Sequence, residues 1–229
     1  MTDVTMSPPV STAPPQTKRQ FMTNVYAHVV GGIAGFIGFE YVLFSTGLAA
    51  DIYALVASTN WLLILGGFMV VSWLASRLSA RATTPAAAYG GYGLLVAVNG
   101  LLFAAPLYRA EQLAPGAIST AATLSVAGFV ALSFIAITTS KDFSFMRGIL
   151  MWGGIVALLA IVGAVVFGFA LGTWFSVAMI AFAGAAILYD TQRVYRSFPP
   201  EATVPAAMHL FSSIALLFWY VLRLVMARD

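Results

Sequence analysis

Seven long apolar runs dominate the chain, and short segments between them carry most of its charged residues. A helix that crosses a bilayer needs about 20 residues, with a range of roughly 17 to 25. The runs cover approximately residues 24–48, 61–76, 86–107, 118–138, 149–170, 173–189 and 206–226. We therefore predict an all-α integral membrane protein with seven transmembrane helices in one bundle. Only Leu171 and Gly172 separate the fifth and sixth runs, which predicts an antiparallel hairpin.

The first 20 residues lack such a run and are rich in proline, serine and threonine. A segment of this composition cannot bury a hydrophobic core. We predict a disordered tail over residues 1–20 and a membrane domain over residues 21–229. The tail also lacks the apolar core of a cleavable signal peptide.

Basic residues are distributed unequally between the two sets of connections. One set holds only Arg109 before the last run. Two further arginines lie within the last run and after it, Arg223 and the terminal Arg228. The other set of connections holds Lys18, Arg19, Arg77, Arg81, Lys141, Arg147, Arg193 and Arg196. Because lysine and arginine accumulate in cytoplasmic loops, this bias predicts a cytoplasmic N-terminus. Seven complete crossings would place the C-terminus outside, whereas a re-entrant last helix would keep both termini in the cytoplasm.

Composition supports the membrane assignment and narrows the chemistry. Of the 229 residues, 61% are hydrophobic and 8% are charged, against about 25% charged in soluble domains. There is no cysteine, so disulfides and thiolate metal sites are excluded. We find no nucleotide-binding or hydrolase motif and no basic-aromatic patch for nucleic acid. His209 with Ser212 or Ser213 is the one candidate catalytic pair, and we expect a protein that is not an enzyme and has no cofactor.

Asp190 ends the sixth apolar run. An ionised aspartate at the centre of a bilayer costs roughly 3 kcal/mol on insertion scales, so such residues usually face a protein interior or a wet cavity. They commonly mark ion or proton pathways. Arg193 and Arg196 follow closely, which leaves open that Asp190 lies just beyond the hydrocarbon edge.

The first run also contains two ionisable residues, His28 and Glu40. Twelve residues separate them, or ~18 Å along a helix and ~120° around it, so they do not touch. Glu40 is either a solvated helix end near the outer interface or a buried carboxylate that binds cations or protons. His28 is either a hydrogen-bonded interior residue or a pH-sensitive group.

The last run carries a polar stripe. His209 and Ser213 are four residues apart and share a helix face. Arg223 follows fourteen residues after His209, within ~40° of that face. Because lipid would penalise this stripe, we predict that the last helix lies inside the bundle.

Several segments together resemble the Bax inhibitor-1 (transmembrane Bax inhibitor motif) family in its bacterial branch. The matching stretches are Ile187-Leu188-Tyr189-Asp190-Thr191, Lys141-Asp142-Phe143-Ser144-Phe145, Leu216-Leu217-Phe218-Trp219-Tyr220-Val221-Leu222-Arg223 and Tyr26-Ala27-His28-Val29-Val30-Gly31-Gly32, together with Glu40. The resemblance covers the chain from about Phe21 onward.

This resemblance implies seven helices, with the last surrounded by the other six, and a pH-sensitive calcium leak. In the family, aspartates of the sixth and seventh helices share a proton and gate the pore, and an arginine of the second helix can pair with them. Asp190 matches the first aspartate, but Ser213 stands where the second is expected. Arg77 and Arg81 are both candidates for the arginine.

From the resemblance and the polar residues we expect a cation leak channel, for Ca²⁺, in the bacterial inner membrane. Asp190, with Ser213, would offer Ca²⁺ a weak oxygen site suited to permeation rather than storage. The candidate ion-binding or gating residues are Asp190, Ser213, Arg77, Arg81, Glu40, His209 and His28. A non-transporting membrane scaffold or stress-response partner and a proton-coupled transporter are the alternatives.

Overall fold

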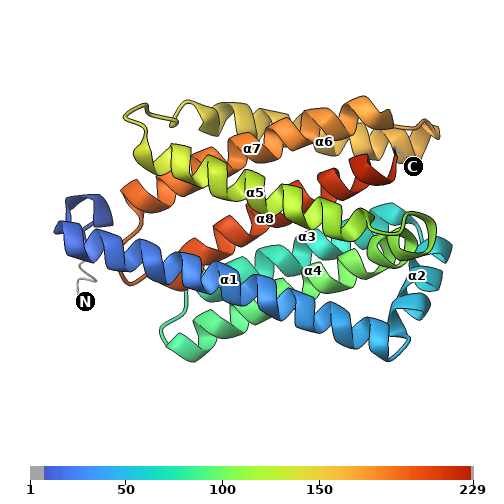
Figure 1. Cartoon of the computed structure of the whole chain (residues 1–229), viewed down its shortest axis with the longest axis horizontal. Coiled ribbons are helices and arrows are strands. Elements are labelled where there is room, and N and C mark those ends of the chain that lie inside the picture. Colours follow the sequence, from blue (N-terminus) through green and yellow to red (C-terminus); the bar gives the residue numbers. More distant parts are fainter. Residues whose placement is uncertain (1–7, 228–229) are drawn as a thin grey trace.

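A computed structural model describes residues 8–227, and these residues form a bundle of helices (Figure 1). Seven helices are long and apolar enough to cross a membrane, which confirms the predicted all-α membrane architecture. They are α1 (Pro15–Ser45), α3 (Trp61–Ala80), α4 (Pro85–Leu113), α5 (Ala117–Thr138), α6 (Met146–Phe167), α7 (Gly172–Ser197) and α8 (Thr203–Met226). A 3₁₀ turn, η1 (Val10–Thr12), and a short helix, α2 (Leu48–Ser58), complete the described elements.

Local sequence signals explain several helix boundaries. The side chain of Asn60 accepts a hydrogen bond from the Leu62 amide and caps the start of α3. Thr84 caps α4 through the Ala87 amide, and Pro85 occupies the first turn, where its missing amide hydrogen costs nothing. Gly168 ends α6 with a positive φ of 71°, a conformation that glycine adopts without steric cost.

The predicted tail of residues 1–20 is ordered over part of its length. α1 begins at Pro15, so the helix extends into the segment that composition assigned to the tail. The Val10 side chain is fully buried, and its backbone amide donates to the Phe198 carbonyl oxygen at the end of α7. This attachment supplies the burial and hydrogen bonding that an isolated proline-rich segment lacks. Residues 1–7 lie outside the described part of the chain.

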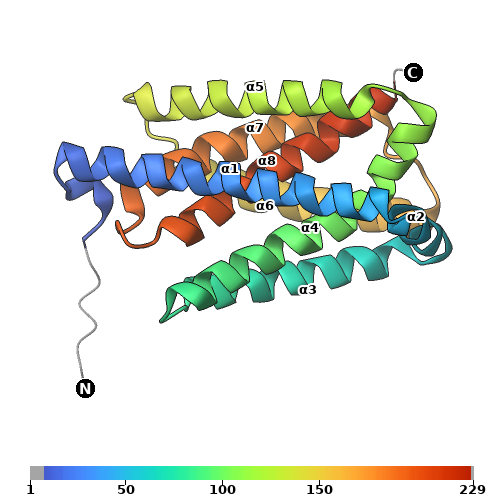
Figure 2. The same ribbon diagram turned by 60° about the horizontal axis from the view of Figure 1, so that its bottom comes forward.

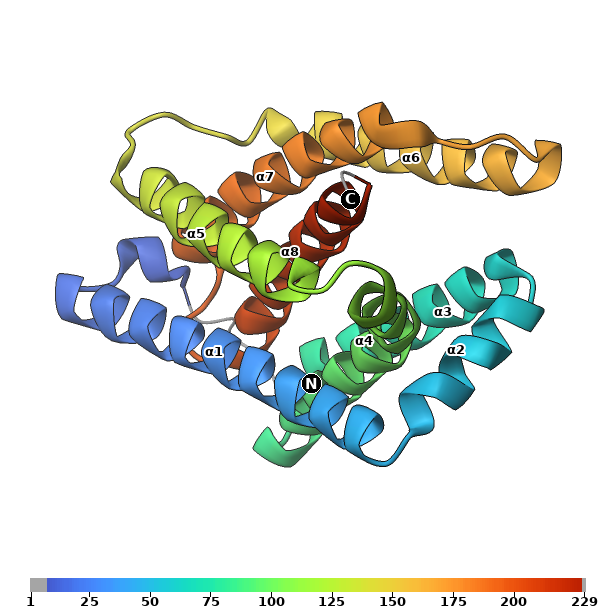
Figure 3. The same ribbon diagram turned by 45° about the vertical axis from the view of Figure 1, so that its right-hand side comes forward.

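The helix α2 was not predicted as a separate element. Gly47, with a φ of 81°, ends the continuous first run and lets the chain turn into α2. At 11 residues α2 is too short to cross a bilayer. It packs on α1 and α4 through a small cluster around Leu43, Ala49 and Ala104 (Figure 3).

The long helices alternate in direction, which gives the bundle two distinct ends. We call the amino-terminal end the one where α1, α4, α6 and α8 begin and α3, α5 and α7 end; it lies on the left in Figure 1. The described chain ends at the opposite side of the bundle, after α8. The eight basic residues of the predicted cytoplasmic connections belong to the amino-terminal end: Lys18, Arg19, Arg77, Arg81, Lys141, Arg147, Arg193 and Arg196.

The last helix, α8, supplies much of the hydrophobic core. It packs against α1, α3, α4, α5 and α7, and Leu210, Phe211, Leu217 and Leu222 are among its buried side chains. By contrast α6 packs chiefly on α7. It lies at the edge of the bundle in Figure 3 and behind α1 in the view of Figure 2. The expected enclosure of the last helix by all six others is therefore not confirmed, although five of them contact it closely.

Candidate functional site

The two residues that the sequence aligned with the family's aspartate pair meet between α7 and α8. The Ser213 hydroxyl donates a hydrogen bond to Asp190 Oδ2 at 2.6 Å. This length is typical of an O–H group bonded to an ionised carboxylate, which is stronger than a bond between neutral groups. Ser213 is buried and Asp190 is half-buried. The contact joins neighbouring antiparallel helices about two turns before the end of α7, toward the amino-terminal end of the bundle.

Ionisable groups surround this pair on the side toward the amino-terminal end. His209 and Arg193 are the charged neighbours of Asp190. His209 lies one helical turn before Ser213 on α8, and Arg193 lies nearly one turn after Asp190 on α7. Both side chains are exposed and approach the same ring: Phe198 lies 5.7 Å from the His209 ring centroid and 5.8 Å from Arg193 Cζ.

The structure thus brings together three of the predicted site residues, Asp190, Ser213 and His209. It adds Arg193, which the sequence indicated only as a marker of orientation and of the membrane edge. Its position three residues after Asp190 was the sequence signal that the two side chains are neighbours, because residues i and i+3 lie side by side on a helix. We call these four residues the α7–α8 polar cluster.

The two residues that follow Asp190 bind other parts of the bundle. Thr191 is fully buried, and its hydroxyl lies 3.4 Å from the Ser133 hydroxyl of α5. The Gln192 side chain is also buried; its oxygen accepts from the Phe143 amide at 2.7 Å, and its nitrogen donates to the Lys141 carbonyl at 2.8 Å. Three consecutive residues of α7 therefore contact α8, α5 and the loop between α5 and α6.

That loop, residues 139–145, is further ordered by Asp142. One carboxylate oxygen of Asp142 accepts from the Ser144 amide at 2.9 Å and from the Ser144 hydroxyl at 2.6 Å, and lies 3.4 Å from Arg196. These hydrogen bonds, with a smaller contribution from Arg196, lower the pKa of Asp142 from its ordinary value. The motif Lys141-Asp142-Phe143-Ser144-Phe145 is thus a docked loop, and nothing in the sequence indicated that Gln192 holds it.

The two arginines proposed as partners of Asp190 are not brought to it. Arg77 and Arg81 are exposed at the end of α3, and the Arg77 guanidinium lies over the Trp73 ring at 4.3 Å from its centroid. Within residues 8–227 the one ion pair found within 4.0 Å joins Arg196 and Asp142. The reason is packing, since α3 lies against α4 and α8 rather than beside the carboxylate on α7.

Glu40 is buried, which excludes the interpretation of a solvated helix end. Its side chain is 7% exposed, and neither carboxyl oxygen has a hydrogen-bond partner among the described residues. It continues the buried stripe of α1, between the aromatic contacts Phe36–Phe103 and Phe44–Tyr108. Glu40 lies five residues before the end of α1, at the end of the bundle opposite Asp190. It is therefore not part of the α7–α8 polar cluster.

His28 is a hydrogen-bonded residue between α1 and α4, and its side-chain hydrogen bonds go to other residues than the α7–α8 polar cluster. Its Nδ1 lies 2.7 Å from the Asn24 carbonyl oxygen, and its Nε2 lies 2.8 Å from the Tyr89 hydroxyl. Because a carbonyl oxygen only accepts, Nδ1 carries the proton in this contact and Nε2 can accept from Tyr89. Arg223 is exposed near the opposite end of α8, so the predicted polar stripe does not continue along the buried face.

Metal ligation by protein groups has little support in the described region. No group of three or more histidine, aspartate or glutamate side chains within residues 8–227 has the arrangement of a metal site. Asp190 and Ser213 present two kinds of oxygen that can contact a cation, together with its remaining water molecules.

Comparison with known proteins identifies the family. A model of the family described as "Inhibitor of apoptosis-promoting Bax1" matches residues 18–229. A membrane protein of Vibrio cholerae serotype O1 is 34% identical over 125 residues, which span 52% of this chain and 53% of that protein. The family match covers α1 from its fourth residue onward, all of the later helices and the whole α7–α8 polar cluster. The chain therefore belongs to the Bax inhibitor-1 family of multi-pass membrane proteins.

Proposed function

We propose that this protein is a pH-sensitive leak pathway for Ca²⁺ in the bacterial inner membrane. The observation that carries the proposal is the hydrogen bond between Ser213 and Asp190, which places a carboxylate between α7 and α8. A carboxylate inside a membrane domain is costly and commonly marks an ion pathway. Membership of the Bax inhibitor-1 family is consistent with a channel-like role.

Asp190 supplies the negative charge that attracts a cation at the amino-terminal end of the pathway. Ca²⁺ normally takes six to eight oxygen ligands. Asp190 and Ser213 offer too few of them for tight binding, so an ion retains most of its water and leaves readily. Arg193, and His209 when protonated, oppose a cation at the same place and so weaken its binding further.

Protons are the second influence on this cluster. Protonation of Asp190 removes the negative charge, and protonation of His209 adds a positive one. Both changes disfavour a cation, so acid is expected to alter flux through the α7–α8 polar cluster. The serine at position 213 replaces the carboxyl partner of the family pattern, so a shared proton between two carboxyls is not part of this proposal.

The proposed orientation places the amino-terminal end of the bundle in the cytoplasm. Eight lysine and arginine residues belong to that end, and such residues accumulate on the cytoplasmic side of inner-membrane proteins. Asp190 would then lie near the cytoplasmic mouth of the pathway, and Glu40 would lie toward the periplasm.

The test is Ca²⁺ entry into liposomes that contain the purified full-length protein, measured across pH. We expect flux from the parent and its loss in Asp190→Asn, which keeps the shape and removes the charge. Asp142→Asn is the matched control, because it removes a carboxylate from an exposed loop at the same end and should keep the flux. No flux from the folded parent would contradict the proposal and favour a scaffold, and a strict requirement for a proton gradient would indicate a proton-coupled transporter.

A further inference from the structure

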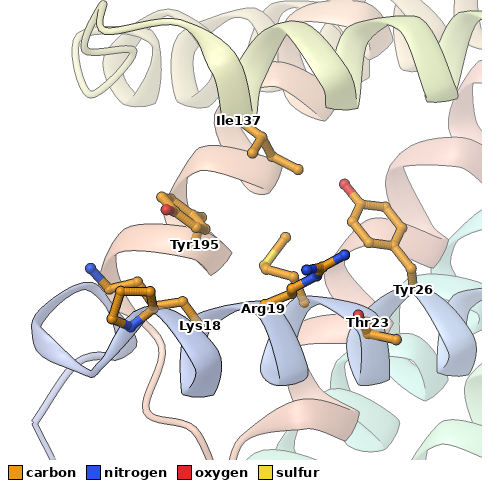
Figure 4. A pocket seen from close by; sticks show the side chains of 8 residues that line it. Lys18, Arg19, Thr23, Tyr26, Ile137 and Tyr195 are labelled. Carbon is orange, nitrogen blue, oxygen red and sulfur yellow. The ribbon is translucent and has the colours of Figure 1, made fainter.

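A cavity of about 670 Å³ lies between α1 and α5, with α7 behind it, at the amino-terminal end of the bundle (Figure 4). Its volume is within the range of sites that hold small molecules. The lining residues come from all three helices: Pro15, Lys18, Arg19, Met22, Thr23, Tyr26, Ile137 and Tyr195. This cavity is separate from the α7–α8 polar cluster and contains none of its residues.

The lining combines cationic and apolar groups in order along α1. Lys18 and Arg19 lie in the first turns of the helix, and Met22 and Tyr26 follow one and two turns later. Ile137 of α5 adds an aliphatic wall opposite α1 (Figure 4). No carboxylate lines the cavity, and within residues 8–227 neither cation has a carboxylate within 4.0 Å. Such a lining suits a molecule with an anionic head and a hydrocarbon chain.

The position along α1 matches the surface of a bilayer. α1 contains 31 residues, so at 1.5 Å per residue it is ~46 Å long, well beyond the ~30 Å of a hydrocarbon core. The apolar run begins only after Gln20, which leaves Lys18 and Arg19 at the level of the lipid headgroups. Tyr26 and Tyr195 have the amphipathic rings that are enriched at this level.

We propose that this cavity binds an anionic phospholipid. The phosphate lies against Lys18 and Arg19, and one acyl chain passes Met22 and Ile137. Basic pockets between transmembrane helices are known to recognise anionic headgroups, and each lysine or arginine near the membrane surface contributes about 1 kcal/mol. The proposal does not depend on ion transport, because it rests on the lining of a different cavity.

A bound lipid would contact helices that also support Asp190. The Tyr26 hydroxyl lies beside the hydroxyls of Ser133 and Thr191, and Thr191 directly follows Asp190. Tyr195 lies five residues after Asp190 on α7. The cavity is therefore bounded by α1, α5 and α7 close to the part of α7 that carries Asp190.

The test is native mass spectrometry of the purified full-length protein with phosphatidylglycerol or phosphatidylcholine that carry identical acyl chains. We expect the parent to retain phosphatidylglycerol in preference to phosphatidylcholine. Lys18→Gln with Arg19→Gln should reduce this retention about tenfold or more, since two cations are removed. Thr23→Phe should reduce it without any change of charge, because the larger side chain fills the cavity.

The matched control is Arg77→Gln with Arg81→Gln, which removes two exposed cations from the same end of the bundle outside the cavity. It should keep the preference, with an unchanged unfolding temperature in all variants. Equal retention of both lipids by the parent overturns the proposal. An equal loss of phosphatidylglycerol retention in both double variants would show that binding follows the overall charge, and this result would also overturn the proposal. Displacement of the lipid by millimolar inorganic phosphate would mean a simple anion site and not a lipid site.

Discussion

Ser213 and Asp190, 23 residues apart in the sequence, are joined by a 2.6 Å hydrogen bond between α8 and α7. The serine hydroxyl donates to the carboxylate oxygen, so the contact favours an ionised Asp190 in this arrangement. In the family pattern a second carboxyl would occupy this place and compete for a proton. The protein thus keeps the contact between the two helices and changes the group that makes it.

Loss of this hydrogen bond should destabilise the bundle. We expect Ser213→Ala to lower the free energy of unfolding by roughly 1.5–3 kcal/mol, the range for hydrogen bonds to charged groups. Ser212→Ala is the control, since Ser212 is exposed and bonds only to the Met208 carbonyl of its own helix. The measurement is thermal unfolding in detergent, and equal unfolding temperatures for the two variants would contradict the prediction.

A second carboxyl at this position should introduce a new response to acid. Two carboxyls so close cannot easily be ionised together, so Ser213→Asp should bind one shared proton. We expect its Ca²⁺ flux to show an acid-dependent transition at higher pH than any transition of the parent. The pair would titrate with two macroscopic constants that belong to both residues. Flux against pH in identical liposomes tests this, and superimposable curves would show that another group senses pH.

The loop between α5 and α6 should depend on Gln192. Gln192→Leu removes both hydrogen bonds to the loop backbone, at Phe143 and Lys141, and should speed amide hydrogen exchange of residues 141–145 by tenfold or more. Arg196→Gln is the comparison, because it removes a partly exposed ion pair with Asp142, and such pairs contribute only about 0–1 kcal/mol. Protection that is kept in Gln192→Leu, or lost equally in both variants, would mean that the amide of Gln192 does not hold the loop.

The buried carboxyl group of Glu40 should lower the stability of the helix bundle. Because its carboxyl oxygens are buried and have no partner among residues 8–227, Glu40→Leu should raise the unfolding temperature by several degrees. If Glu40 lies on the cation pathway, as residues of this kind commonly do, the same change should lower Ca²⁺ flux. Unchanged flux in a stabilised variant would remove Glu40 from the pathway, and a lowered unfolding temperature would contradict the packing argument.

The orientation can be tested with one engineered cysteine, since the chain contains none. Glu201 is exposed in the connection between α7 and α8, at the amino-terminal end. In intact cells, Glu201→Cys should resist a membrane-impermeant thiol reagent and react only after the membrane is opened. The control is Leu113→Cys, which is exposed at the other end of the bundle and should react from outside. Gly116 is less suitable, because its φ of 86° would strain a cysteine backbone. The reverse labelling pattern would overturn the proposed orientation.

The number and type of the long helices followed from the sequence alone. A bilayer requires each crossing segment to be long, apolar and internally hydrogen-bonded, so seven such runs already specify seven helices. The cost of Asp190 within an apolar run and the burial of Ser213 were likewise visible as a local pattern, whereas His209 and Arg223, which were predicted to share the buried face of Ser213, are exposed. These predictions depend on neighbouring residues and on the solvent, and both can be assessed from sequence.

The contacts between distant segments were decided only by the tertiary structure. Nothing in the spacing of Gln192 and Phe143 indicates that an amide side chain holds a loop 49 residues away. Likewise, the sequence does not indicate that the Val10 amide binds the end of α7, and Arg77 is separated from Asp190 because α3 packs elsewhere. The physical reason is that helix formation depends on local hydrogen bonds and hydrophobicity, whereas the partner of a polar side chain depends on which helix faces meet in the packed bundle.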